Sequence, residues 1–278
     1  MPYRSIAVHI NRSSRCKERV ALAASIARNF GAHLIGVAAT GLAALSPAWG
    51  QGELGYYYAD IERRQRAACE EAMRDFDEQV RRLALESFEH RLAEDEDTRA
   101  MALSARYSDL LIIGQNDEHD PTIGTGSNFD AEVVLSAGRP VIVVPYAGRF
   151  DTIGKDILVC WDASREAARA VTDALPFLTV ADRVQVVVIN ATPSLDGHGA
   201  DPGADVASYL ARHGVPVDVV QERTDLDVNL AILNRAAEQG SDLIVMGGYG
   251  HSRLREILLG GVTRGILEAM TVPVLVSH

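Results

Sequence analysis

The chain has 278 residues, of which 47% are hydrophobic, 23% are charged and 6% are aromatic. That composition is typical of a globular protein, and the length suits two domains of about 140 residues each. A formal net charge of −11, with no run of lysines and arginines to offset it, excludes a general role in binding nucleic acid.

The chain begins with an apolar run over residues 5–10, without the charged, apolar and small-residue regions of a signal peptide. No stretch reaches the roughly 18 apolar residues of a membrane span. The three cysteines, Cys16, Cys69 and Cys160, lie far apart and form neither a disulfide framework nor a metal motif. We therefore expect a cytoplasmic protein without a membrane partner.

The first half opens with a predicted strand, Ser5–Ile10, followed by polar residues that can cap a helix over residues 17–30. A second strand is predicted over residues 32–39. Next come a Gly- and Tyr-rich loop, 41–58, and a long charged helix, 59–86, whose charges we expect to face solvent.

The ends of the two halves repeat each other. Ser108–Gly114 is followed by Pro140–Val143, and Ser241–Gly247 by Pro273–Val276, with 26 positions between glycine and proline in both. The starts also match, because a strand over 155–161 leads through polar residues into a helix over 165–178. The remaining segments predicted in the second half are a strand over 183–190, a loop over 192–203, a helix near 205–213 and a helix over 263–270. The repeat predicts a tandem duplication.

Continuous β-branched runs alternating with amphipathic helices are typical of parallel strands covered on both faces. With right-handed crossovers, each half is predicted to be a doubly wound, Rossmann-like α/β domain. The expected domains are residues 1–148 and 152–278.

A glycine-spaced loop in the second half, Gly247–Thr263, carries the clearest functional signal. It follows a buried strand, 243–246, at the sheet edge where such folds bind ligands. The amides of Gly261, Val262 and Thr263 are expected at a helix N-terminus, which favours phosphate. Read structurally, the same residues are two tight turns and a helix start.

The pattern Gly-x2-Gly-x9-Gly, formed by Gly247, Gly250 and Gly260 and followed by Val262 and Thr263, resembles the universal stress protein (UspA-type) family. The resemblance implies an adenine-nucleotide α-hydrolase-like fold that binds ATP, or ADP or AMP, with Mg²⁺ accompanying the nucleotide. At Gly261 the family's ATP-binding branch has Ser or Thr, so the resemblance implies weaker or altered binding here.

Two further residues match the family. Asp162 matches an Asp on the adenine and ribose side of the nucleotide, although it could instead cap the following helix. Ile189 matches a position whose backbone contacts adenine, and a plain core residue fits equally well. The complete expected nucleotide-binding set is Asp162, Ile189, Met246, Gly247, Gly250, His251, Arg253, Gly260, Gly261, Val262 and Thr263.

The first half does not repeat this loop. Asp117, Ser127 and Asp130 stand at the positions of Gly250, Gly260 and Thr263, and Asn11 replaces Asp162. Because carboxylates repel phosphate, this first-half site is predicted to be degenerate.

Three functions remain open from sequence. The leading hypothesis is a regulatory, stress-response protein that binds an adenine nucleotide in its second half. The second is a slow ATP-hydrolysing enzyme, for which the sequence shows no evident general base; His251 is the nearest titratable candidate. A ligand-free interaction module is the third. The resemblance also implies pairing of the two last strands, 140–144 and 273–277, as an intramolecular pseudo-dimer. It leaves open a homodimer of two chains.

Overall fold

The computed structural model describes residues 2–42, 53–117, 120, 128–191, 201–250 and 261–278. Its helices and strands follow one order twice along the chain. The first series is β1 (Ser5–His9), α1 (Cys16–Phe30), β2 (His33–Ala39), α2 (Glu53–Arg82), β3 (Phe88–Ala93), α3 (Asp97–Arg106), β4 (Leu110–Gly114), α4 (Phe129–Ala137) and β5 (Val141–Val144). The second is β6 (Asp156–Cys160), α5 (Arg165–Leu178), β7 (Arg183–Ile189), α6 (Ala204–Arg212), β8 (Val217–Glu222), α7 (Val228–Gln239), β9 (Leu243–Gly247), α9 (Val262–Ala269) and β10 (Val274–Ser277). This repetition confirms the predicted tandem α/β fold.

The chain divides into two compact units. The N-terminal unit comprises Tyr3–Ala137 and Arg149–Asp151, and the C-terminal unit comprises Met1–Pro2, Gly138–Gly148 and Thr152–His278. Strand β5 thus groups with the second-half elements. We keep a boundary of the repeat between residues 148 and 152 as a proposal.

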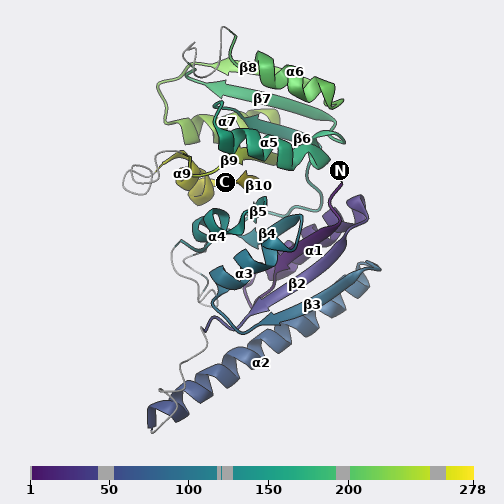
Figure 1. Ribbon diagram of the computed structural model, residues 1–278, viewed down its shortest axis with the longest axis vertical. Coiled ribbons are helices and arrows are strands. Elements are labelled where there is room, and N and C mark those ends of the chain that lie inside the picture. Colours follow the sequence, from purple (N-terminus) through teal and green to yellow (C-terminus); the bar gives the residue numbers. More distant parts are fainter. Residues whose placement is uncertain (1, 43–52, 118–119, 121–127, 192–200, 251–260) are drawn as a thin grey trace. The chain divides into compact units, whose positions relative to one another are not determined.

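Each unit has a sheet with a reversal in strand order. In the N-terminal unit the order is β3-β2-β1-β4, and all neighbours are parallel. In the C-terminal unit it is β8-β7-β6-β9-β10-β5 (Figure 1), with every pair parallel except the last. The reversals fall between β1 and β4 and between β6 and β9. At such a point two crossovers leave in opposite directions, which opens a crevice at the carboxyl ends of the strands.

Helices cover both faces of each sheet. Right-handed crossovers place α1 and α2 on one face of the N-terminal sheet and α3 and α4 on the other. Contacts between α1 and α2, between α3 and α4, and between α7 and α9 agree with this arrangement. The central strands are fully buried, as in β4 and β9, where the first four residues of each are inaccessible to solvent. This burial explains their continuous apolar sequences.

Two local expectations need correction. The predicted loop 41–58 is shorter, because α2 begins at Glu53; its 30 residues span about 45 Å and extend beyond the end of β3 (Figure 1). In addition, α1 has no side-chain cap, since its N-cap residue is Arg15, whereas Ser164 caps α5 as expected.

The two last strands of the repeat pair with each other, as predicted. Strands β5 and β10 are antiparallel, with Val143 opposite Val274 and Val141 opposite Val276. No helix in the described part of the chain is long and apolar enough to cross a membrane.

Candidate functional site

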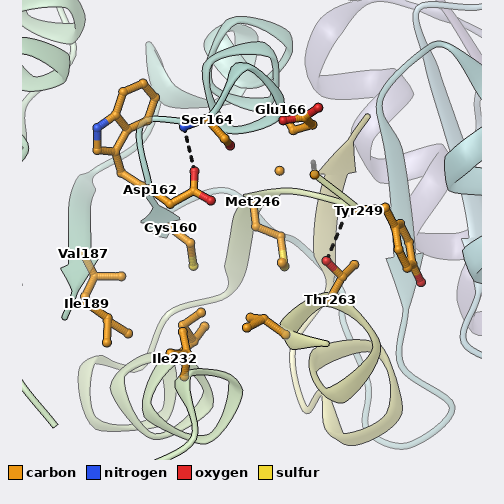
Figure 2. Close-up of a pocket in the computed structure, with 15 residues that line it drawn as sticks. Cys160, Asp162, Ser164, Glu166, Val187, Ile189, Ile232, Met246, Tyr249 and Thr263 are labelled. Atoms are coloured by element: carbon orange, nitrogen blue, oxygen red, sulfur yellow. Dashed lines mark hydrogen bonds between the residues drawn. The ribbon is translucent and has the colours of Figure 1, made fainter. Parts of the chain in front are cut away.

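A cavity of about 350 Å³ lies at the carboxyl edge of the C-terminal sheet, where the strand order reverses. Its walls come from the ends of β6, β7 and β9 and from α7 and the starts of α5 and α9. Figure 2 shows the labelled side chains arranged around this space. Its volume is within the range of small-molecule sites.

Asp162 stands at the end of β6. Its Oδ1 accepts a hydrogen bond from the Ser164 amide at 2.9 Å, while the Ser164 hydroxyl accepts from the Ala167 amide at 3.1 Å. Ser164 is therefore the residue that caps α5, and Asp162 shapes the turn before it. The other carboxylate oxygen, Oδ2, takes no part in this turn and can accept a hydrogen bond from a ligand.

One side of the cavity is apolar. It is built from Cys160, Val187, Ile189, Val228, Ile232 and Met246. Desolvation raises the pKa of the Cys160 thiol to about 12, and the charge of Asp162 adds to the shift. The thiol is therefore neutral near pH 7 and serves as part of the apolar wall. Such a wall suits a flat aromatic ring.

Two of the three glycines of the motif, Gly247 and Gly250, are described, and they have different roles. A Cβ on Gly247 would lie 2.5 Å from the backbone nitrogen of Ala167 and 2.6 Å from the carbonyl carbon of Glu166. Glycine at 247 is thus required for α5 to approach β9. At Gly250 a Cβ would meet Glu166 at 3.5 Å, an ordinary contact. Packing against the described residues, which leave out 251–260, therefore does not demand glycine at 250.

The start of α9 closes the other side of the cavity, where Val262 and Thr263 line it. The Thr263 Oγ1 accepts a hydrogen bond from the Tyr249 amide at 3.3 Å, so the hydroxyl proton remains available to a ligand. Gly261 is the N-cap residue of α9, with φ −52° and ψ 166° and no side-chain cap.

Backbone strain gathers around the cavity. Ala163, Asn190 and Tyr249 have φ values of 60°, 53° and 53°, and they follow the ends of β6, β7 and β9. Left-handed backbone costs a non-glycine residue roughly 1 kcal/mol or more, and such residues concentrate at functional sites. The one other described non-glycine residue with positive φ, Ala84, lies in the N-terminal unit.

The structure brings most of the expected residues together. Those that line the cavity are Asp162, Ile189, Met246, Gly247, Gly250, Val262 and Thr263. Gly261 adjoins them as the cap of α9. His251, Arg253 and Gly260 lie outside the described residues. The sequence did not point to Glu166, Val228, Ile232 or Tyr249, which also line the cavity. That each of these residues binds a nucleotide stays a prediction.

At the corresponding edge of the N-terminal sheet, polar side chains occupy the place of the apolar wall. His9 ends β1 as Cys160 ends β6, and Asp97 begins α3 as Val228 begins α7. The Nε2 atom of His9 lies 3.3 Å from Oδ1 of Asp97. Burial lowers the pKa of His9, and Asp97 opposes that shift.

Arg19 completes this polar cluster. Its Nε donates to the carbonyl of His9 at 2.8 Å, and Nη2 donates to Oδ1 of Asn11 at 2.9 Å. A Cβ on Gly114, the counterpart of Gly247, would lie 2.5 Å from Nη1 of Arg19. A buried guanidinium therefore lies against this first-half glycine. Asp117, which was predicted to repel a phosphate in the first half, is therefore only one of the differences between the two halves.

The match to a known protein family covers the second half of the chain. Residues 154–278 match the model of the universal stress protein family. This half of the chain is therefore similar to the universal stress proteins, and the matched segment is a little under half of the whole chain. The matched segment contains β6 to β10, and with them most of the residues around the cavity. The first half shares the domain's order of elements.

Individual universal stress proteins give a consistent result. Universal stress protein Slr1230 from Synechocystis is 26% identical over 169 residues, which cover 60% of this chain and 57% of the relative. Universal stress protein MJ0577 from Methanocaldococcus jannaschii is 44% identical over 45 residues, 16% of this chain and 28% of the relative. The matches thus span just over half of one curated relative and under a third of the other.

The fold is shared over a greater length. The crystal structure of a universal stress protein from Archaeoglobus fulgidus aligns with a TM-score of 0.72 and 16% identity, and covers 98% of this chain and 95% of that one. This likeness shows that the same fold, with its tandem order of elements, occurs in a universal stress protein.

Proposed function

We propose that this chain is a universal stress protein, that it binds an adenine nucleotide, ATP, ADP or AMP, in the cavity of its second half, and that binding serves a regulatory role in stress response. The observation that carries the proposal is the cavity itself, which combines an apolar wall with polar groups at the switch point of an α/β sheet.

The two sides of the cavity suit the two ends of such a ligand. The apolar wall around Ile232 and Met246 fits a purine, and Asp162 can accept a hydrogen bond from an exocyclic amine or a ribose hydroxyl. On the opposite side, the amides at the start of α9 and the Thr263 hydroxyl favour a phosphate. When Mg²⁺ accompanies the nucleotide, it would neutralise part of the phosphate charge.

Isothermal titration with AMP, ADP and ATP tests the proposal directly. We expect one nucleotide per chain, and we expect Gly250→Asp to abolish binding because it places a carboxylate beside the phosphate. Gly250→Ala is the matched control: among the described residues its Cβ makes an ordinary contact with Glu166, so we expect this variant to fold and bind.

A second control uses the first half. Asp117 corresponds to Gly250, and Asp117→Gly should leave the stoichiometry at one because the polar cluster around Arg19 remains. Equal binding by Gly250→Asp would contradict the placement of the phosphate beside Gly250. Absence of binding by the wild-type chain would overturn the proposal and favour the ligand-free interaction module.

A further inference from the structure

One peptide group just after β9 is held from both sides. Its carbonyl, that of Gly248, accepts a hydrogen bond from Nδ1 of His278 at 2.9 Å. Its N–H, that of Tyr249, donates to Oγ1 of Thr263 at 3.3 Å, as Figure 2 shows at the edge of the cavity. The Gly248 amide also donates to the Ser277 carbonyl at 2.9 Å. Residues at the end of β10 and at the start of α9 thus fix how this peptide is turned.

The bond from His278 defines where one proton of the imidazole lies. A carbonyl oxygen can only accept a hydrogen bond, so Nδ1 carries the hydrogen, whether the ring is neutral or charged. His278 is half-buried, whereas Gly248 and Tyr249 are buried. Water therefore has little access to the carbonyl, and the imidazole is the group that holds it from this side.

The backbone at Tyr249 depends on such contacts. Its φ is 53°, and a non-glycine residue stays in this left-handed region only where its surroundings hold it there. Without the His278 bond the peptide can turn, and a turned peptide no longer points its N–H at Thr263. While the Thr263 hydroxyl accepts from Tyr249, its own proton points elsewhere and is available in the cavity that Thr263 lines.

The described lining of the cavity does not include His278, so any effect of this residue on a ligand is exerted through the peptide. Thr263 is one of the groups expected above to donate to phosphate. Resting on the proposed function, we infer that His278 is a positioning residue for the phosphate of the nucleotide. It holds the peptide between residues 248 and 249, and this peptide keeps the Thr263 hydroxyl directed toward the phosphate.

The first half shows that the fold itself does not require this arrangement. In the register that aligns the two last strands, Pro145 stands at the position of His278, and Asp130 stands at the position of Thr263. Proline has no side-chain donor, and aspartate lacks the hydroxyl group that threonine offers. The donor and the hydroxyl therefore occur together in the half that has the cavity.

The test is titration of the full chain with adenosine, AMP and ATP, for wild type and two variants of His278. Because the bond orients only the phosphate side, His278→Leu should weaken AMP and ATP about 5- to 10-fold and change adenosine by less than about 2-fold. His278→Asn should restore the binding of AMP and ATP, since the asparagine Nδ2 donor occupies the place that Nδ1 has in histidine. Asparagine reproduces only this donor, so the rescue separates the Gly248 bond from the other contacts of the imidazole.

A double-mutant cycle tests whether His278 acts through Thr263. Thr263→Val removes the hydroxyl and should weaken AMP about 10-fold while sparing adenosine. In the Thr263→Val chain, His278→Leu should then change the AMP affinity by less than about 2-fold, because no hydroxyl remains to be oriented. An equal effect of His278→Leu in both chains would overturn the route through this peptide.

His213→Leu is the control for loss of an imidazole from the same unit. His213 is exposed and follows α6, so this variant should leave the affinities of all three ligands unchanged. Thermal unfolding of each variant shows that it is folded before its affinities are compared.

The outcomes separate this inference from the proposed function. The role of His278 is overturned, and the nucleotide site stands, if His278→Leu binds AMP and ATP as wild type does or weakens adenosine equally. Failure of His278→Asn to restore binding has the same meaning. If none of the three ligands binds wild type, the proposed function and this inference are both overturned.

Discussion

The two halves fold the same elements in the same order, yet they treat the same crevice differently. In the second half, Cys160 and Val228 are apolar walls of a cavity; in the first half, His9 and Asp97 occupy those positions and face each other at 3.3 Å. Arg19 fills the space against Gly114. A duplicated fold therefore fixes where a crevice forms, and a few side chains decide whether a ligand can enter it.

Glycine-to-alanine changes at the two corresponding strand ends should give the largest difference. In Gly247→Ala the new methyl group meets the backbone of α5 at 2.5 Å, and backbone cannot move aside cheaply. We expect a loss of about 3 kcal/mol in the free energy of unfolding. In Gly114→Ala the methyl meets the end of the Arg19 side chain, so the loss should be about 1 kcal/mol. Urea unfolding measures both, and equal losses would contradict this account.

Removal of the guanidinium tests how the first crevice is filled. Arg19→Ala takes away the guanidinium donor of the His9 carbonyl and one of the two donors of Asn11 Oδ1, which keeps the Ser13 amide; the loss should cost about 2 kcal/mol. Arg12→Ala, at a side chain that is 57% exposed, is the control and should change stability by less than about 0.5 kcal/mol. A small effect of Arg19→Ala would mean that water already hydrates this crevice.

His9 should make the stability of the chain depend on pH. Burial lowers its pKa in the folded state below the ordinary 6.5, so the unfolded chain binds more protons as the pH falls below that value. The stabilisation is complete above about pH 6.5 and declines as the pH falls through the folded-state pKa.

The variant His9→Cys introduces the residue found at the corresponding position of the second half, Cys160. It should remove the part of the acid-side loss of stability that is due to His9. Thermal unfolding between about pH 7 and pH 5 measures it. The groups that face His9 are Asp97 and Arg19, so both must be unchanged in the comparison. Parallel curves for wild type and His9→Cys would show that His9 does not contribute.

The smallest effect is expected at the cap of α9. Gly261 has backbone angles that suit serine, so Gly261→Ser should add a side-chain cap and gain a few tenths of a kcal/mol. The hydroxyl should also tighten nucleotide binding, which titration would detect. Gly203→Ser, at the cap of α6, is the opposite control: its φ of 91° and a Val219 methyl at 2.7 Å should make serine destabilising. A gain at both positions would refute the backbone argument.

The sequence revealed the repeat and the central strands because burial on both faces leaves continuous apolar runs. It did not reveal β3, Phe88–Ala93, or β8, Val217–Glu222, whose residues are only partly buried. These strands lie at the ends of their parallel sets, with a partner on one side within the unit. A half-covered strand with charged residues gives little hydrophobic signal.

The sequence pointed to the glycines, the strand ends and the start of α9 as parts of the cavity, but not to its remaining walls. Glu166 and Arg19 look like ordinary charged residues at the start of an amphipathic helix. Their burial depends on how closely α1 and α5 approach Gly114 and Gly247, which is a tertiary property. The apolar wall from α7 was missed for the same reason: no helix was predicted over residues 228–239, and Val228 and Ile232 reach the cavity only through the packing of α7.

The antiparallel pair of β5 and β10 also matters for what happens when the chain is shortened. β10 has β9 on one side and β5 on the other, so both of its rows of backbone amides and carbonyls are occupied. A fragment that contains only residues 152–278 would lack β5. Strand β10, Val274–Ser277, is entirely buried in the whole chain and would become an open edge of the sheet in this fragment. Open apolar edges recruit further strands. Residues 152–278 alone should therefore self-associate, with a second copy taking the place that β5 holds in the whole chain.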